Sequence, residues 1–273
     1  MHDQHLHSRH SFDSQAEPED NVLRAIEVGL RGLTFTEHFD THPDEWPTCR
    51  YDDARYSDDL AALRAKYGDA IFIGKGIEVC YQPRQMAFVL DFLERHEFDL
   101  IILSIHWCGE RAAHLREHWP EDDPNRMMST YLDTVLEAVR FARGLHRGGP
   151  RVFDVLGHMD FVKRYIHRFF GVSELPGHEA VTEEILRTCL EADLIPEVNT
   201  STLRSGLGEP MPGGRTIRRY AELGGVCMSL GSDAHKAADI GSHFDAAARL
   251  LREGGISSTA TFARRQVRRV PIE

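Results

Sequence analysis

The sequence lacks the patterns that mark several common classes of protein. Its five cysteines are scattered, odd in number and without any C-x-x-C pair, so we expect buried thiols in a reducing compartment and no cysteine-based zinc site. No apolar run is long enough to cross a bilayer, and no signal sequence opens the chain. Together these absences predict a soluble cytoplasmic protein.

Positive charge is also scarce. The chain carries 32 Lys and Arg residues against 43 Asp and Glu, which gives a formal net charge of -11. Nucleic-acid backbones and anionic membrane surfaces would repel such a chain, so we expect neither a nucleic-acid partner nor a membrane partner. A homo-oligomer of the chain remains compatible with this composition.

Length and patterning predict one large domain over residues 1–273. The chain is 41% hydrophobic, which is enough for a substantial core, and no linker or low-complexity segment divides it. Short apolar runs alternate with helical patterns. After a short amino-terminal strand, the strand-like runs span 32–38, 70–79, 99–107, 152–157, 194–199 and 226–231. The helical patterns span 17–31, 56–67, 84–95, 126–146, 178–193, 216–223 and 238–252.

About seven β-α units of this kind form either a closed barrel or an open, doubly wound sheet. An open sheet usually carries a glycine-rich phosphate loop after an early strand, but neither G-x-G-x-x-G nor G-x-x-x-x-G-K-[ST] occurs here. We therefore predict an α/β fold of the barrel type.

The most informative motif is His5-Leu6-His7, close to the amino terminus. Side chains alternate across a strand, so both imidazoles of a His-x-His pattern point to the same side. Two imidazoles directed at one point form half of a metal site. On its own the pattern is weak, and its weight depends on the residues at the ends of the other strands.

All predicted strands but one end in, or are followed by, an imidazole or a carboxylate. The carboxyl ends of parallel barrel strands converge on one rim, where barrel enzymes carry their chemistry. This mixture of ligands suits Zn²⁺, Mn²⁺ or Fe²⁺. The candidate ligands are His5, His7, His38, Glu78, His106, His158, Asp233 and His235.

These ligands are too numerous for a single ion. A lone histidine at a strand end is more often capped or solvated than a ligand, but that explanation would have to hold independently at six imidazoles. Six imidazoles with at least two carboxylates therefore predict a multinuclear site.

The ordered motifs resemble those of the polymerase-and-histidinol-phosphatase (PHP) superfamily, in its monofunctional histidinol-phosphatase branch. The resemblance covers nearly the whole chain. It implies a distorted, TIM-like (β/α) barrel of seven strands and a trinuclear metal centre. The motifs are D-x-H-x-H-S with S-x-D at 11–13, Thr36-Glu37-His38, Gly76-Ile77-Glu78, Ser104-Ile105-His106, Gly157-His158-Met159-Asp160, Asn199-Thr200-Ser201 and Gly231-Ser232-Asp233-Ala234-His235.

The resemblance also implies how the ligands are shared. One ion would be held by His5, His7, Glu78 and Asp233, a second by Glu78, His106 and His158, and a third by Asp13, His38 and His235. Two positions depart from the family pattern. Glu37 stands where the family often has aspartate, so we give it no role as a ligand, and Asp13 stands where some relatives have histidine, which would alter metal preference or occupancy.

Three divalent ions outweigh the three carboxylates of this set, so the site should be cationic and suit a phosphate monoester. Water activated by the metals would attack phosphorus in line with the leaving group. Side chains that follow strand ends could clamp the phosphate, namely Lys163, Arg164 and Arg204, and the resemblance supports Arg204. Asp160 would either protonate the leaving group or orient a ligand.

The interpretation that these features favour is a metal-dependent phosphatase that releases phosphate from L-histidinol phosphate in histidine biosynthesis. Candidates to recognise the amine and imidazole of that substrate are Glu45, Trp46, Trp107 and Glu110. One alternative keeps the site but changes the substrate to another phosphomonoester or a nucleotide phosphodiester. A metal-dependent amidohydrolase would need a carbamylated lysine, for which Lys75 is the candidate, and a non-catalytic barrel module is disfavoured by the full ligand set.

Overall fold

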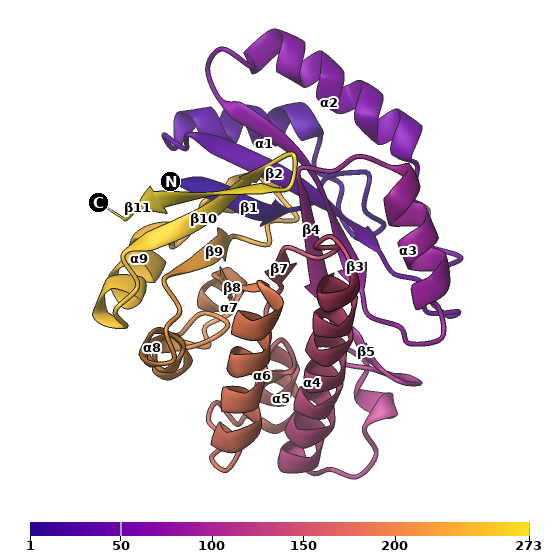
Figure 1. Ribbon diagram of the computed structural model, residues 1–273, viewed down its shortest axis with the longest axis vertical. Helices are drawn as coiled ribbons and strands as arrows, with labels where there is room; N and C mark the ends of the chain where they lie inside the picture. Colours follow the sequence, from indigo (N-terminus) through magenta and orange to yellow (C-terminus); the bar gives the residue numbers. More distant parts are fainter. Residues whose placement is uncertain (50, 273) are drawn as a thin grey trace.

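The computed structural model describes residues 1–49 and 51–272 (Figure 1). Within these residues one sheet has the strand order β1-β2-β3-β4-β7-β8-β9-β10-β11, and β5 and β6 form a separate antiparallel pair. The larger sheet consists of β1 (His2–Leu6), β2 (Gly32–Phe39), β3 (Phe72–Cys80), β4 (Leu100–Ser104), β7 (Val155–Leu156), β8 (Ile195–Asn199), β9 (Cys227–Gly231), β10 (Ser258–Ala263) and β11 (Gln266–Pro271). The small pair is β5 (Trp107–Cys108) and β6 (Arg111–Ala112).

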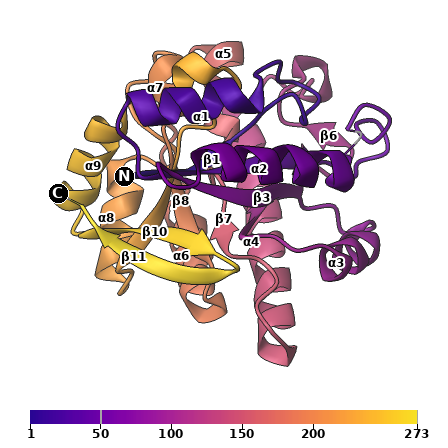
Figure 2. The ribbon, with the colours of Figure 1, turned by 90° about the horizontal axis from the view of Figure 1, so that it is seen from above.

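Helices connect the strands and lie outside the curved sheet (Figure 2). Two of them start at clear sequence signals, because Asp52 and Asp123 accept hydrogen bonds from the first backbone N–H groups of α2 and α4. The α-helices are α1 (Pro18–Glu27), α2 (Asp53–Tyr67), α3 (Met86–Arg95), α4 (Pro124–Gly148), α5 (Val162–Phe170), α6 (Glu179–Ala192), α7 (Ser201–Arg204), α8 (Gly214–Glu222) and α9 (Phe244–Glu253). The 3₁₀ turns are η1 (Arg116–His118) and η2 (Ala237–Asp239).

In the larger sheet, the seven strands in the order β1-β2-β3-β4-β7-β8-β9 pair in parallel. They curve until the first meets the segment that follows the seventh. The N–H of His7 donates to the carbonyl of Ala234 at 2.8 Å, and the N–H of Asp233 donates to the carbonyl of His5 at 2.7 Å. β1 therefore lies beside the segment after β9 at the carboxyl ends of the strands.

The barrel is distorted at its opposite end. There β10 pairs with the first half of β9, and β11 extends the sheet antiparallel to β10. The contact from β1 to this addition runs through a side chain, because the N–H of Phe262 donates to Gln4 Oε1 at 3.1 Å.

An apolar floor lies inside the barrel beneath the carboxyl ends. Leu100 and Ile102 on β4 join Val155 and Phe262 in a small buried cluster, whereas the alternate residue Ile101 belongs to the larger core under the helices. This alternation is the one expected of barrel strands, whose side chains point in and out in turn. The histidines and carboxylates that end the strands thus lie above an apolar layer.

Several elements differ from the sequence-based expectation. The predicted strand 99–107 ends at Ser104, and α5, α7 and the β10–β11 hairpin were not predicted. α5 buries only Val162 and Ile166 along its length, which is too short an apolar pattern to stand out. β11 is almost entirely exposed, so it lacks the apolar run by which the other strands were recognised. No helix within the described ranges is both long enough and apolar enough to span a membrane.

Candidate metal centre

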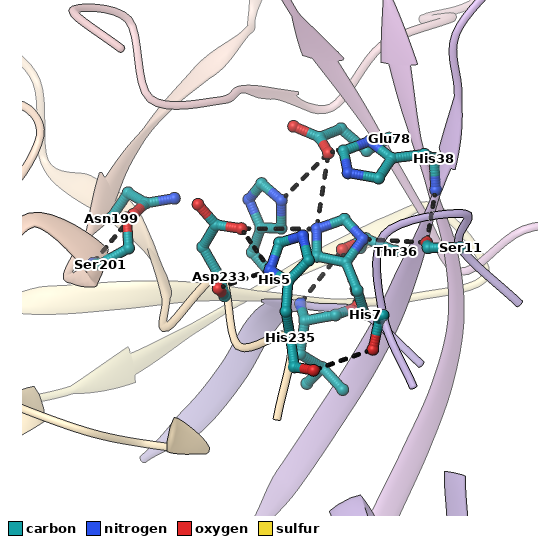
Figure 3. Close-up of polar contacts among 12 residues, drawn as sticks. His5, His7, Ser11, Thr36, His38, Glu78, Asn199, Ser201, Asp233 and His235 are labelled. Atoms are coloured by element: carbon teal, nitrogen blue, oxygen red, sulfur yellow. Dashed lines mark hydrogen bonds and ion pairs between the residues drawn. The ribbon is translucent and has the colours of Figure 1, made fainter. Parts of the chain in front are cut away.

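The side chains predicted at the strand ends come together at one end of the barrel (Figure 3). β1 supplies His5 and, one residue beyond its end, His7, while β2 and β3 supply His38 and Glu78. The remaining members follow the ends of β4, β7 and β9, and they are His106, His158, Asp233 and His235. Residues far apart in the sequence therefore converge as predicted from the geometry of parallel strands.

Glu78 lies at the centre of this cluster. Its carboxylate oxygens lie between 2.8 and 3.6 Å from ring nitrogens of His5, His7, His38, His106 and His158. Oε2 faces His5 and His7, whereas Oε1 faces His106 and His158. A carboxylate with different imidazoles at each oxygen has the geometry required to bridge two ions.

A second group of side chains lies nearer the mouth of the site. Oδ2 of Asp13 is 3.0 Å from His235 Nε2 and 3.4 Å from His38 Nε2. Oδ1 of Asp233 is 3.5 Å from both His7 Nε2 and His235 Nδ1. Asp13, which only the family resemblance had suggested, thus lies with two of the predicted imidazoles.

The buried atoms of the cluster fit a bound cation. His5 Nε2, His7 Nε2 and Glu78 Oε2 are buried and have no hydrogen-bond partner. Such atoms are costly unless something satisfies them, and the two ring nitrogens face the carboxylate oxygen at 3.4 and 3.6 Å. Four triads have ligand atoms close enough to hold an ion, namely His7-His38-His235, His5-Glu78-His158, His5-His7-Asp233 and His38-Asp40-His106.

The electrostatics of the cluster also favour cations. Burial would raise the pKa of the Glu78 carboxyl, but neighbouring imidazoles, first among them His5 and His106, hold that pKa well below its usual range. Burial would lower the pKa of His5, but the carboxylates of Glu197 and Glu78 outweigh it and raise that pKa well above its usual value. Carboxylates that draw protons onto buried imidazoles draw metal cations to the same place.

A cavity of about 340 Å³ opens onto the cluster. Phe12, Phe161 and Tyr165 supply aromatic walls, and Arg164 and Arg168 bring positive charge to its edge. His5 and His7 lie beneath this cavity and are fully buried. The arrangement can therefore hold cations at its floor and an anion above them.

Of the predicted phosphate-binding residues, the structure brings Arg164 to this cavity. Its guanidinium donates to Asp233 Oδ2 at 3.2 Å and to the hydroxyl of Ser201. The ring of Phe161 lies 5.1 Å from the guanidinium carbon and supports its position. One face of Arg164 is thus fixed by protein groups, while the side chain still lines the cavity.

The structure does not bring Lys163 or Asp160 to the metal centre. Lys163 forms an ion pair with Glu209, and both it and Asp160 line a different cavity of about 650 Å³ between α4, α5, α6 and α8. Burial raises the pKa of the Asp160 carboxyl. Adjacent residues of a helix point in different directions, which is why Lys163 and Arg164 line different cavities.

Arg204 is also directed away from the cavity. Its guanidinium donates to the carbonyls of Ser232 and Asp233 at 2.7 and 3.0 Å and to the hydroxyl of Ser242 at 3.0 Å. These contacts hold the backbone around Asp233, whose φ of 52° is unusual for a residue other than glycine. The predicted phosphate contact is therefore replaced by support of a predicted ligand.

Two carboxylates near the cluster were missed from the sequence. Asp40 Oδ2 lies 3.0 Å from His106 Nδ1, and Glu197 Oε1 lies 2.7 Å from His5 Nδ1. Asp40 follows His38 by two residues, the spacing that places side chains on one face of an extended segment, and this signal could have revealed it. Glu37, which was given no ligand role, accepts hydrogen bonds from Ser8 and Ser11.

Of the residues predicted to recognise an amine, the structure places Glu45 at the cavity. Trp107 instead stacks on His42 with ring centroids 3.6 Å apart. Trp46 packs against Phe39. Trp46, Trp107 and Glu110 are not among the described residues that line the cavity.

Comparison with known proteins finds similarity to the PHP domain and to histidinol-phosphatases. A family model described as PHP domain matches residues 3–201. The probable histidinol-phosphatase of Deinococcus radiodurans is 26% identical over 275 residues, which cover 97% of each protein. The histidinol-phosphatase of Lactococcus lactis subsp. lactis is 26% identical over 264 residues, which cover 96% of this chain and 94% of the relative.

Solved structures give the same result for the fold. The histidinol phosphate phosphatase of Lactococcus lactis, crystallised with zinc, L-histidinol and phosphate, superposes with a TM-score of 0.81 at 24% identity and 98% coverage of both chains. A putative histidinol phosphatase from Listeria monocytogenes superposes with a TM-score of 0.79 at 23% identity, over 90% of this chain and 99% of that one. The predicted α/β fold is confirmed by these likenesses.

Proposed function

Because the chain belongs to the PHP domain family, we propose that it is a metal-dependent phosphomonoesterase that hydrolyses L-histidinol phosphate to L-histidinol and phosphate. The observation that carries the proposal is the arrangement around Glu78, whose two oxygens face different imidazoles. Arg164 stands at the same cavity and adds a group suited to phosphate. Relatives that match over most of this chain are named histidinol-phosphatases, which supports the choice of substrate.

We propose a centre of three divalent ions, drawn from zinc, manganese and iron. The ligands would be His5, His7, Glu78 and Asp233 for the first ion, Glu78, His106 and His158 for the second, and Asp13, His38 and His235 for the third. The triad His5-His7-Asp233 supports the first set, and the short distances from Asp13 to His38 and His235 support the third. Divalent ions at such a site neutralise phosphate charge and activate water as the nucleophile.

The chain's own residues would bind and orient the substrate. Arg164 has a planar guanidinium that can donate two parallel hydrogen bonds to phosphate oxygens. The aromatic rings of Phe161 and Tyr165 would exclude water from the phosphate, because they line the cavity beside Arg164. Glu45, on the same cavity, would accept a hydrogen bond from the substrate ammonium group.

The proposal includes a single catalytic domain and a reducing, cytoplasmic location. The hydrogen bonds between β1 and the segment after β9 support one folding unit over most of the chain. Five buried free cysteines support a reducing compartment.

Phosphate release from L-histidinol phosphate tests the function directly. The purified protein, loaded with zinc or manganese, should hydrolyse this substrate with a much higher kcat/KM than p-nitrophenyl phosphate, sugar phosphates or nucleotides. His158→Ala should abolish the activity, because it removes one of the imidazoles at Glu78 Oε1. Equal rates with L-histidinol phosphate and p-nitrophenyl phosphate would refute the substrate but leave a phosphomonoesterase.

The other function classes have less support. The ammonium group of Lys75 pairs with Asp53 Oδ1 at 2.7 Å, so it is not placed to become a bridging carbamate as in an amidohydrolase. A barrel that had lost catalysis would be expected to lose ligands first, yet the predicted imidazoles remain clustered. Another phosphomonoester or a nucleotide phosphodiester as substrate is tested by the same panel.

A further inference from the structure

We propose that two buried carboxylates, Glu197 and Glu37, are positioning residues that fix the proton on Nδ1 of His5 and of His7. Both imidazoles then present the Nε2 lone pair to the centre of the cluster. The inference rests on the proposed metal centre but not on any particular substrate.

Glu197 acts directly on His5. Its Oε1 lies 2.7 Å from His5 Nδ1, and both side chains are buried. A carboxylate can only accept a hydrogen bond, so the Nδ1 atom must carry the proton and Nε2 must be free of one in the neutral imidazole. The other oxygen of Glu197 accepts from the N–H of His158 at 2.8 Å, which fixes the carboxylate in turn.

Gly231, which has no side chain, leaves the space that the Glu197 carboxylate occupies. A Cβ atom on Gly231 would lie 2.3 Å from Glu197 Oε1 and 2.4 Å from the Cβ of His5. Glycine is therefore required at this end of β9 because the carboxylate and the imidazole pack against its backbone. This gives a reason for the first residue of the Gly231-Ser232-Asp233 motif that ligand binding alone does not give.

Glu37 acts on His7 through the hydroxyl of Ser11. Ser11 Oγ lies 2.5 Å from Glu37 Oε2, 3.1 Å from His7 Nδ1 and 3.0 Å from the backbone nitrogen of His38. A serine hydroxyl has one proton to donate and two lone pairs. The hydroxyl donates its one proton to Glu37, so the oxygen must accept from both His38 N–H and His7 Nδ1–H.

Ser8 also donates two hydrogen bonds to Glu37, one of them from its backbone. Its backbone N–H donates to Glu37 Oε2 at 3.1 Å, and its hydroxyl donates to Oε1 at 2.6 Å. The glutamate of the Thr36-Glu37-His38 motif is thus engaged by two serines of the first motif. Glu37 orients His7 through the hydroxyl of Ser11 and does not itself bind an ion.

The two tautomers have a common consequence at the floor of the site. His5 Nε2 and His7 Nε2 lie 3.4 and 3.6 Å from Glu78 Oε2, and none of these atoms has a hydrogen-bond partner. In these neutral tautomers, two lone pairs and a carboxylate oxygen face one another and would repel. A cation between them removes the repulsion and takes the place of a proton on His5, so the tautomers direct three donor atoms at one bound ion.

Nuclear magnetic resonance of the zinc-loaded protein tests the proposal through the ring N–H groups. We expect protected Nδ1–H signals from both His5 and His7, the first lost in Glu197→Gln and the second lost in Ser11→Ala. The Glu197→Gln side chain would keep an oxygen for the N–H of His158 but would place an amide donor against His5 Nδ1. Ser8→Ala is the matched control and should keep both signals. It also removes a hydroxyl donor from Glu37, but it keeps the backbone N–H that donates to Oε2, and the hydroxyl next to His7 Nδ1 is that of Ser11.

Zinc retention against a graded chelator provides a second measurement. Glu197→Gln and Ser11→Ala should each weaken zinc binding about 10- to 100-fold, the range seen when a hydrogen-bond partner of a ligand is removed. Ser8→Ala should bind as the wild type does. Wild-type spectra with the proton on Nε2 of either histidine would overturn the proposal, even if a variant failed to fold. Equal weakening in Ser8→Ala and Ser11→Ala would also overturn it.

These readouts require no substrate. A protein with both Nδ1–H signals but no activity on L-histidinol phosphate would refute the proposed function and retain this inference. Full activity in the wild type together with unaltered zinc binding in Glu197→Gln and Ser11→Ala would retain the proposed function and refute this inference.

Discussion

At the scale of single residues, the site separates the groups proposed to hold cations from the group proposed to hold an anion. Glu78 and the imidazoles around it lie at the buried floor, where positive charge is favoured by the carboxylates. Arg164 lies above them, with one side tied to Asp233 and Ser201. A dianionic phosphate between these two layers would meet positive charge from below and from the side, despite the net charge of -11 on the chain.

Replacing Arg164 with lysine tests this layer. Arg164→Lys keeps the charge but loses the planar fork, so we expect kcat/KM for the phosphate ester to fall about 10- to 100-fold, which corresponds to roughly 1.5–3 kcal/mol for a charged hydrogen bond. Steady-state kinetics on the metal-loaded variant would measure it.

The neighbouring residue supplies the control for Arg164. Lys163→Gln changes a charge one position away, on a side chain that pairs with Glu209 in the other cavity. It should keep the wild-type kcat/KM. An equal loss in both variants would show that kcat/KM is sensitive to any substitution at this end of α5, and that the loss in Arg164→Lys does not report a contact with phosphate.

At the scale of elements, the strands that build the rim could be predicted, but the short elements that support it could not. β2 and β3 are apolar runs whose ends carry His38 and Glu78, so both the strand and its candidate ligand were visible. α5 was missed because it buries few residues. Without this helix, the sequence could not predict that the side chains of Lys163 and Arg164 point in different directions. Glu197 was missed because the sequence shows a carboxylate on a strand but not that a histidine of the first strand packs against it.

The end of β9 shows how closely these elements are packed. Gly231→Ala would place a methyl group within 2.4 Å of both Glu197 and His5, and neither a strand backbone nor a buried carboxylate can move away cheaply. We expect a loss of roughly 1–3 kcal/mol in the free energy of unfolding, as for overpacked cores. Denaturant unfolding of the metal-free protein would measure this loss without a contribution from bound ions.

Gly144 offers a matched control within α4. A Cβ atom there would meet nothing within 4 Å, and alanine is favoured over glycine inside a helix. Gly144→Ala should therefore stabilise the protein by roughly 0.5–1 kcal/mol. If Gly231→Ala proved as harmless as Gly144→Ala, the close packing at the end of β9 would be wrong.

At the scale of the whole molecule, the candidate metal centre lies where the first strand of the barrel meets the segment after β9. β1 pairs with β2 along one edge. Along its other edge, two backbone hydrogen bonds join it to the segment after β9. The contact between β1 and β10 runs through Gln4. Proposed ligands come from β1, β2 and β3 and from the segments after β4, β7 and β9, so an ion bound by them would tie the first strand to the last.

Metal removal should therefore destabilise the fold as well as abolish activity. An ion that binds only the folded chain stabilises it by about 2.7 kcal/mol when its free concentration is 100 times its dissociation constant. We expect the chelated protein to unfold at a clearly lower temperature than the zinc-loaded protein, and re-addition of zinc to restore the difference. Asp160→Asn should keep this response because Asp160 faces the other cavity, whereas Glu78→Gln should lose most of it because its carboxylate faces imidazoles from several strands. The same unfolding temperature with and without zinc would mean that the barrel closes without help from metal, and that β1 is held by its hydrogen bonds alone.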